Sequence, residues 1–212
     1  MTSMFYITIS LLVIAIVLVI NELWWRNKAS HAEHHRKFVH ITVGTFVAFW
    51  PYYLSWTEIR LLSLVLLVAI AASKTLKIFA SIHAVDRATV GEICFALAVG
   101  GLTFVTRSDW IYTASLLQMS LADGLAAIVG IHFRRNNGYK VLGAQKSVAG
   151  TLSFFIISLS ILIIARLVSG TVFELWLVLV TSLAATLSES IASYGLDNLL
   201  LPMVSAFMLT RL

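Results

Sequence analysis

Cysteine, proline and charged residues are all scarce in this chain, and each scarcity limits what the protein can be. The single cysteine, Cys94, permits no internal disulfide and lies in an apolar run, where a small buried residue is its expected role. The two prolines, Pro51 and Pro202, fall near the end of one apolar run and inside the last one. Charged residues make up 12% of the chain and hydrophobic residues 59%, whereas a soluble domain is about half apolar. A soluble domain is therefore excluded, and an integral membrane protein is predicted.

Apolar runs recur along the whole chain, with no fixed repeat and no polar block large enough for a second domain. About 20 helical residues cross the roughly 30 Å hydrocarbon core of a bilayer. The first run lacks a basic start and a small-residue cleavage site, so we expect a retained helix and not a signal peptide. We predict an all-α fold, a polytopic bundle of about eight transmembrane helices in one domain of residues 1–212, in which 1–35 form the first helix and a basic linker. The expected spans are Phe5–Leu23, Phe38–Tyr53, Ile59–Thr75, Thr89–Val105, Trp110–Ile131, Ser147–Val168, Val172–Tyr194 and Leu196–Leu209.

Basic residues gather in alternate loops. They are concentrated in or beside the loops that join spans one to two, three to four and five to six. By the positive-inside rule these loops are cytoplasmic, and both termini lie on the other side of the membrane. A basic membrane face suits anionic lipid headgroups or phosphates, and no nucleic-acid-binding motif is present. The basic residues of these loops are Arg26, Lys28, Arg36, Lys37, Lys74, Lys77, Arg87, Arg134, Arg135, Lys140 and Lys146.

The acidic residues divide into those that a helix cap explains and those that it does not. Three glutamates follow a serine or threonine by three residues where a span begins, which is the pattern of a capping box. Asp123, Glu189 and Asp197 have no such explanation, and with eight spans they converge on the cytoplasmic side. Together they would hold Mg²⁺, which prefers oxygen ligands and shares them with substrate phosphates; ion pairing with nearby lysines and arginines is the alternative. The three capping pairs are Ser55–Glu58, Thr89–Glu92 and Thr171–Glu174.

Asp123 stands inside an apolar span, and a loop rich in basic residues and glycine follows that span. An ionised aspartate near the centre of a bilayer costs roughly 2.5–3.5 kcal/mol, so it needs a partner, a metal or a water-filled cavity. Ser120 precedes it at the capping-box spacing, but a cap at this point would require a broken helix. Phosphates would bridge the carboxylate and the basic loop. A helix end beside a positive cytoplasmic loop is the simpler alternative.

The second span opens with RKFVH, in which Arg36 and His40 are four residues apart and share one helix face. Lys37 lies about 100° around the helix. Gly44 continues the Arg36 face and would let another backbone approach. The histidines before this span lack the regular spacing of metal ligands and are expected in a solvated linker. They are His31, His34 and His35.

The segment KSVAG opens the sixth span. Lys146, the Ser147 hydroxyl and the free backbone N–H groups of a helix N-terminus would form an anion site. The GxxxxGK[ST] pattern of a Walker A loop is absent. On the fifth span, small residues follow the carboxylate and leave room for a neighbouring helix or a ligand. They are Ala126, Ala127 and Gly130.

Several short segments form an ordered set over residues 36–202. They are RKFVH with Gly44, RATVGE at 87–92, ADGLAAIVG at 122–130, KSVAGT at 146–151 and ESIASYGLDNLLLP at 189–202. Together they resemble the CTP-dependent lipid-alcohol kinases, a family that contains dolichol kinase, phytol and farnesol kinases and the CTP-dependent diacylglycerol kinase. The KSxAG form is most similar to the phytol kinase branch, because dolichol kinase usually has an acidic residue at the position of Ala149. Where the family usually has a glycine four residues after Gly130, this chain has Arg134; its next glycine is Gly138, which predicts a longer nucleotide loop.

The resemblance implies a membrane kinase that moves the γ-phosphoryl group of CTP, or of another nucleoside triphosphate, to the hydroxyl of an isoprenoid or polyprenol-type alcohol. Such transfer needs mainly positioning and charge neutralisation. The alcohol would stay in the bilayer and meet the nucleotide at the cytoplasmic face. The implied catalytic residues are Asp123, Lys146, Arg36 and His40; the implied nucleotide-binding residues are Lys37, Gly130, Ser147, Gly150 and Asn198; and the implied Mg²⁺ ligands are Asp123, Glu189 and Asp197, with Asp123 also the candidate proton acceptor.

Two other kinds of protein remain as alternatives at this stage. A phosphatidate cytidylyltransferase also binds CTP at a membrane face, but the chain lacks the dense terminal run of Lys-Asp and paired Asp motifs of that family. A small transporter would explain carboxylates inside the membrane without catalysis, although such proteins often carry inverted repeats and none is visible here.

Overall fold

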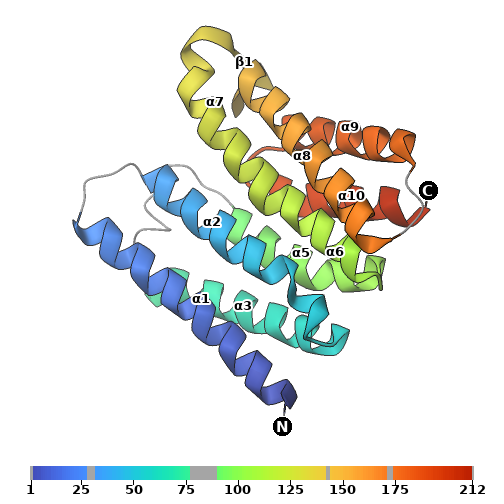
Figure 1. Cartoon of the computed structure of the whole chain (residues 1–212). Helices are drawn as coiled ribbons and strands as arrows, with labels where there is room; N and C mark the ends of the chain where they lie inside the picture. Colours follow the sequence, from blue (N-terminus) through green and yellow to red (C-terminus); the bar gives the residue numbers. More distant parts are fainter. Residues whose placement is uncertain (1, 28–31, 77–89, 142–143, 171–173, 212) are drawn as a thin grey trace.

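The computed structural model describes residues 2–27, 32–76, 90–141, 144–170 and 174–211, and it is a bundle of helices with one small hairpin (Figure 1). The prediction of an all-α fold is confirmed. Each predicted span contains a helical segment, and the fifth is continuous through three of them, α6, η2 and α7. The elements are α1 (Thr2–Asn27), α2 (Ala32–Ala48), η1 (Trp50–Tyr52), α3 (Trp56–Leu76), α5 (Gly91–Val105), α6 (Asp109–Leu117), η2 (Gln118–Ala122), α7 (Asp123–Asn137), β1 (Gly138–Val141), β2 (Ala144–Ser147), α8 (Val148–Ser169), α9 (Leu175–Ile191) and α10 (Asp197–Arg211).

Within the described residues, the apolar helices fall into two groups, those long enough to span a membrane and shorter ones. Those long and apolar enough to cross a membrane are Ser3–Arg26, Trp56–Leu76, Asp109–Phe133 and Val148–Ser169. Helices α5 and α9 are apolar but shorter. Large apolar side chains are exposed along these helices, which is how a membrane protein presents itself to lipid. The chain is accordingly an integral membrane protein.

The segment between the fifth and sixth spans is a hairpin, and not the longer loop that the sequence predicts. Helix α7 continues past Arg134 to Asn137, and Gly138 then begins strand β1. Strands β1 and β2 are antiparallel, with Tyr139 opposite Lys146. The hairpin lies where α7 ends and α8 begins, and these two helices run side by side (Figure 1). An aromatic and a β-branched residue in β1 favour the extended backbone that the hairpin requires.

One of the three predicted capping boxes is present in full. The Ser55 N–H donates to Glu58 Oε2 across 2.7 Å, and the Glu58 N–H donates back to Ser55 Oγ across 3.4 Å. Glu92 lies in the first turn of α5 and forms an ion pair with Lys74 at 2.9 Å, while its predicted partner lies outside the described residues. Glu174 stands at the N-cap position of α9 itself without a side-chain capping bond, so the third box is not formed as predicted.

Two glycines let α2 pack closely against the fifth helical segment. A methyl group added at Gly44 would overlap the side chain of Ser120, and one added at Gly124 would overlap Ile41. The prediction that another segment lies close to Gly44 is therefore confirmed, and the neighbouring group is the side chain of Ser120 in η2. This contact brings the first turns of α2 to the start of α7.

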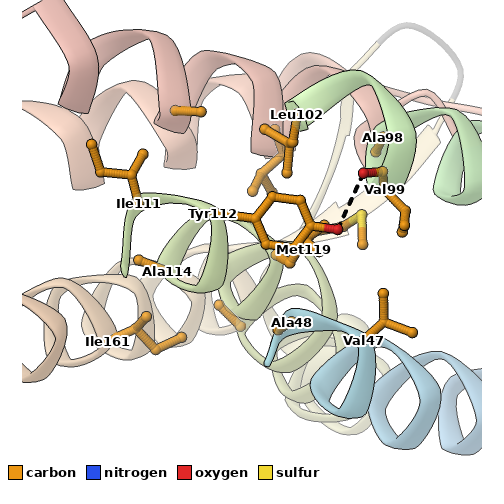
Figure 2. Close-up of a cluster of buried hydrophobic side chains, with 14 of the residues drawn as sticks. Val47, Ala48, Ala98, Val99, Leu102, Ile111, Tyr112, Ala114, Met119 and Ile161 are labelled. Carbon is orange, nitrogen blue, oxygen red and sulfur yellow. Dashed lines mark hydrogen bonds between the residues drawn. The ribbon is translucent and has the colours of Figure 1, made fainter. Parts of the chain in front are cut away.

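The interior is mainly apolar, and hydrogen bonds from buried polar side chains tie its helices together. Tyr112 of α6 is fully buried among Leu102, Ile111 and Met119 (Figure 2). Its hydroxyl donates to the Val99 carbonyl across 3.1 Å (Figure 2), which satisfies the one polar atom of the ring and ties α6 to α5. The charged residues that the sequence singles out lie at the end of the bundle that carries the hairpin.

Candidate active site

A cavity of about 510 Å³ opens where the ends of several elements meet. Its wall is formed by parts of six elements. These are the start of α2, the first half of α7, strand β2, the start of α8, the end of α9 and the start of α10. Every site residue predicted from the sequence lines this cavity except His40. The predicted convergence of Asp123, Glu189 and Asp197 thus occurs in space. The lining residues are His34, Arg36, Lys37, Asp123, Ala126, Ala127, Gly130, Ile131, Gln145, Lys146, Ser147, Gly150, Thr151, Glu189, Ala192, Ser193, Tyr194, Gly195, Asp197 and Asn198.

Asp123 and Lys37 form a buried ion pair at the inner wall of the cavity. Lys37 Nζ lies 2.6 Å from Asp123 Oδ2, and each side chain is 7% exposed. A buried charge is costly unless it is paired and hydrogen-bonded, so this contact explains how an aspartate is accommodated in an apolar helix. Ion pairing, the alternative raised for this carboxylate, is the arrangement present.

The helix that carries Asp123 is wider than an α-helix in the turn before it. Residues Gln118–Ala122 form a π-helical turn, and α7 begins at Asp123. The helix is thus reshaped and not broken, and the Ser120 hydroxyl donates back to the Leu116 carbonyl at 2.9 Å instead of capping. Single π-turns inside α-helices occur often at functional sites. The sequence gives no periodic signal for this turn.

His40 supports the site from beneath the cavity wall. Its Nε2 donates to the Met119 carbonyl of the π-turn across 2.9 Å and lies 3.7 Å from Asp123 Oδ2. A carbonyl can only accept, so this nitrogen carries the proton. The predicted direct catalytic role of His40 stays a prediction, and the geometry places it beside the aspartate, off the cavity surface.

Lys146 and Glu189 form a second ion pair among the residues that line the cavity. Lys146 Nζ donates both to the Glu189 carboxylate and to the Glu189 backbone carbonyl. The lysine comes from β2 and the glutamate from the last turn of α9, and both are largely buried. Two lysines on separate elements therefore meet two carboxylates across one cavity.

The start of α8 is capped by its own serine. Ser147 is the N-cap residue, and its Oγ accepts from the Gly150 N–H at 3.0 Å. The expectation that Gly150 offers a free N–H is therefore wrong for that group. A methyl group at Gly150 would lie 3.1 Å from the Gly130 Cα and 3.1 Å from the Ala126 carbonyl oxygen. These glycines let α7 and α8 approach each other at the base of the cavity.

Asp197 and Asn198 begin α10 at the rim. Asp197 Oδ1 accepts from the Asn198 N–H at 3.0 Å, a bond within the helix start. Asn198 is buried, and its side-chain amide donates to the Gly91 carbonyl across 2.8 Å. Asn198 thus ties α10 to α5, and its predicted contact with the nucleotide stays a prediction.

The three carboxylates do not form a complete metal site on their own. Among the described residues, no group of three His, Cys, Asp or Glu side chains lies close enough to hold a metal ion. The donor chemistry nevertheless suits Mg²⁺, which is usually bound through one or two carboxylates and the oxygens of substrate phosphates. The predicted ligands Asp123, Glu189 and Asp197 stay a prediction on this ground.

The histidines placed by sequence in a linker belong to a helix. His34 and His35 lie in α2, and His31 lies outside the described residues. His35 is fully buried, with its Nδ1 3.1 Å from Asn21 Oδ1 of α1 and its ring 4.5 Å from that of Trp24. The linker prediction is wrong because α1 extends to Asn27 and its tryptophans cover this turn.

The sequence reasoning missed Tyr194, which lines the cavity from the connection between α9 and α10. It is the one non-glycine residue with a positive φ, 58°, in the part of the chain that the structure describes, and Gly195 follows at 91°. A bulky residue in this region costs of order 1–3 kcal/mol and persists only when its surroundings hold it there. The Val90 N–H donates to the Tyr194 carbonyl across 3.1 Å. The predicted spans end at Tyr194 and begin again at Leu196, but nothing in the sequence marks the tyrosine side chain as part of the site.

Comparison with known proteins supplies one relative. The chain is 33% identical over 198 residues to a phytol kinase from Synechocystis sp. (strain ATCC 27184 / PCC 6803 / Kazusa), and the match covers 90% of this chain and 84% of the relative. No protein-family model matches the chain, and no solved structure does so either. The match therefore covers most of both chains.

Proposed function

Because this chain belongs to the phytol kinase-like lipid kinase family, we propose that it transfers the γ-phosphoryl group of CTP to the hydroxyl of an isoprenoid alcohol. The observation that carries this proposal is the placement of Lys37 and Lys146 opposite three carboxylates in one cavity. Phosphoryl transfer depends mainly on positioning and on neutralising the charge of the phosphates. The cavity supplies both cations and oxygen ligands for that purpose.

The triphosphate would lie between Lys37 and Lys146 in the cavity. Lys37 and Arg36 approach from the start of α2, and Lys146 approaches from β2. The first turn of α8 adds backbone N–H groups and the positive end of the helix dipole. Ser147 is already engaged in capping this turn, so it would position the α8 start and not hold the phosphate alone.

The three carboxylates would serve the cation and the acceptor. Mg²⁺, when bound, would neutralise phosphate charge, with ligands from Asp123, Glu189 and Asp197. The two ion pairs would then exchange partners: the lysines would turn to phosphate oxygens, and Asp123 and Glu189 would become available as ligands. Exchange keeps every buried charge compensated, which a low-dielectric site requires.

The reaction itself joins the alcohol oxygen to the γ-phosphorus. As this bond forms, the bond from the γ-phosphorus to the bridging oxygen breaks, and CDP leaves with the electron pair. The alcohol proton passes to a base, for which Asp123 is the candidate. His40 holds the backbone of the turn before Asp123 and so fixes where the carboxylate points.

The acceptor would reach the cavity from the lipid. Ala126, Ala127 and Gly130 form a wall of small side chains along α7, and large apolar residues of the same helix, including Leu125 and Ile128, are exposed. An apolar tail would remain beside these residues in the bilayer while its hydroxyl enters the cavity. The basic residues around this end of the bundle support a cytoplasmic position for the cavity.

The direct test is a reaction of the purified protein in lipid nanodiscs with Mg²⁺, γ-labelled CTP or ATP, and a panel of alcohols. Phytol, farnesol, a polyprenol and diacylglycerol would distinguish the acceptor classes. We expect label to move to a prenyl alcohol with release of CDP. Release of pyrophosphate would point to a cytidylyltransferase, and the absence of nucleotide binding would point to a transporter.

A further inference from the structure

The proposed donor carries a planar base as well as a triphosphate, and the base needs a surface on which to lie. The lysines, the carboxylates and the start of α8 engage phosphates and metal. Among the described residues that line the cavity, only Tyr194 and His34 carry an aromatic or imidazole ring. The phenol ring offers the larger flat face, and Tyr194 is an exposed residue.

The backbone of Tyr194 makes this ring unusual. Its φ of 58° lies in the left-handed region, which glycine and asparagine occupy far more easily than an aromatic residue. A turn that served only to join α9 to α10 would be less strained with a small residue at this position. The chain nevertheless carries tyrosine here and fixes its carbonyl by a 3.1 Å bond from the Val90 N–H. This strained backbone holds the Tyr194 side chain in the wall of the cavity.

The connection that carries Tyr194 joins two elements of the proposed site, α9 and α10. Tyr194 lies between Glu189, which pairs with Lys146, and Asp197, which begins α10 at the rim. A nucleotide whose phosphates contact Lys146 would extend through the cavity that Tyr194 also lines. The residues of α7 that line the cavity include no aromatic ring that could provide such a surface.

We propose that the phenol ring of Tyr194 is the face on which the base of the nucleoside triphosphate stacks, an inference that rests on the proposed function. Stacking on an aromatic ring tolerates every base, because each base has a π-face. Tyr194 therefore strengthens binding of the nucleotide without itself selecting cytosine. The competing role for a tyrosine at this depth is that of an aromatic anchor at the membrane interface.

The test compares ligands with and without a base. Binding of CTP and of inorganic tripolyphosphate is measured on the full-length protein, unchanged and carrying Tyr194→Asn or Tyr194→Phe. Asparagine tolerates the left-handed backbone, so this variant should melt at the same temperature as the unchanged protein or higher. We expect Tyr194→Asn to bind CTP about tenfold or more weakly, to bind tripolyphosphate normally, and Tyr194→Phe to retain both affinities.

Three results would overturn the inference while leaving the kinase assignment intact. These are normal CTP binding by Tyr194→Asn, an equal loss of CTP and tripolyphosphate, which would indicate a change in cavity shape, and loss of CTP binding by Tyr194→Phe. A Tyr194→Asn variant that binds CTP normally but partitions less well into nanodiscs would establish the anchoring role in its place. Failure of the unchanged protein to bind CTP at all would remove the proposed function and this inference together.

Discussion

Lys37 Nζ donates to Asp123 Oδ2 across 2.6 Å although the two residues are 86 positions apart in the chain. The pair joins α2 to the start of α7 at the wall of the cavity, and Lys146 and Glu189 form a second such pair in the same cavity. In the proposed reaction both cations pass from carboxylates to phosphates. The following predictions test the parts of this arrangement separately.

Asp123→Asn should abolish turnover while the protein still folds. The amide keeps the size of the side chain and can still accept from Lys37, but it cannot hold Mg²⁺ or accept the alcohol proton. Loss of a group that acts in the transition state lowers kcat more than it raises KM. The measurement is steady-state kinetics with a prenyl alcohol, and the control is Glu58→Gln in the capping box of α3, which should cost about 1 kcal/mol or less and leave activity largely intact. Normal turnover by Asp123→Asn would show that the division into capping and catalytic acids is wrong.

Lys146→Ala should weaken binding of the nucleoside triphosphate, because it removes a point charge beside the start of α8. Lys140 provides a matched control, since it lies on β1 of the same hairpin and does not line the cavity. Lys140→Ala removes the same charge from the same hairpin and should leave CTP affinity nearly unchanged. Equilibrium binding of labelled CTP distinguishes the two variants. Equal affinities would mean that the hairpin lysine serves only the ion pair with Glu189.

Gly124→Ala should separate α2 from α7, because the added methyl group would overlap Ile41. Overpacking of this kind costs typically 1–3 kcal/mol, and here it also moves Lys37 away from Asp123. We expect a lower melting temperature and lower activity. Adding Ile41→Ala makes room for the methyl group and should restore part of both losses. A double variant no better than the sum of its two single changes would exclude the contact as the cause.

The cavity end of the bundle should face the cytoplasm. Reporter fusions at the hairpin and at both termini test this directly, and Cys94→Ala provides a cysteine-free background for labelling single introduced cysteines from either side. Residues of the hairpin should be labelled from the cytoplasm and the termini from the other side. A cytoplasmic C-terminus would contradict the orientation deduced from the basic loops.

The sequence predicted the bundle well, because apolar length is a local property that each span carries by itself. It also located Asp123, Glu189 and Asp197, since a carboxylate without a cap or a solvated loop needs another explanation. The sequence could not predict that Lys37 is the partner of Asp123, because this contact depends on how α2 packs against the fifth helical segment at Gly44 and Gly124.

The features that the sequence missed are set by geometry and leave little local trace. The π-turn before Asp123 has no distinctive composition, and it becomes visible only through the bond from His40 to the Met119 carbonyl. The burial of His35 depends on side chains of α1. The left-handed backbone of Tyr194 follows from the way that α9 and α10 are joined.

The two ion pairs also have a consequence for the order in which charged residues enter the membrane during synthesis. In each pair the lysine precedes its carboxylate in the chain: Lys37 comes before Asp123, and Lys146 comes before Glu189. A lysine that is inserted first can extend its long side chain and keep its ammonium group at the membrane surface until its carboxylate partner is inserted. The shorter carboxylates, which cannot reach the surface as easily, arrive when their counterions are already in place.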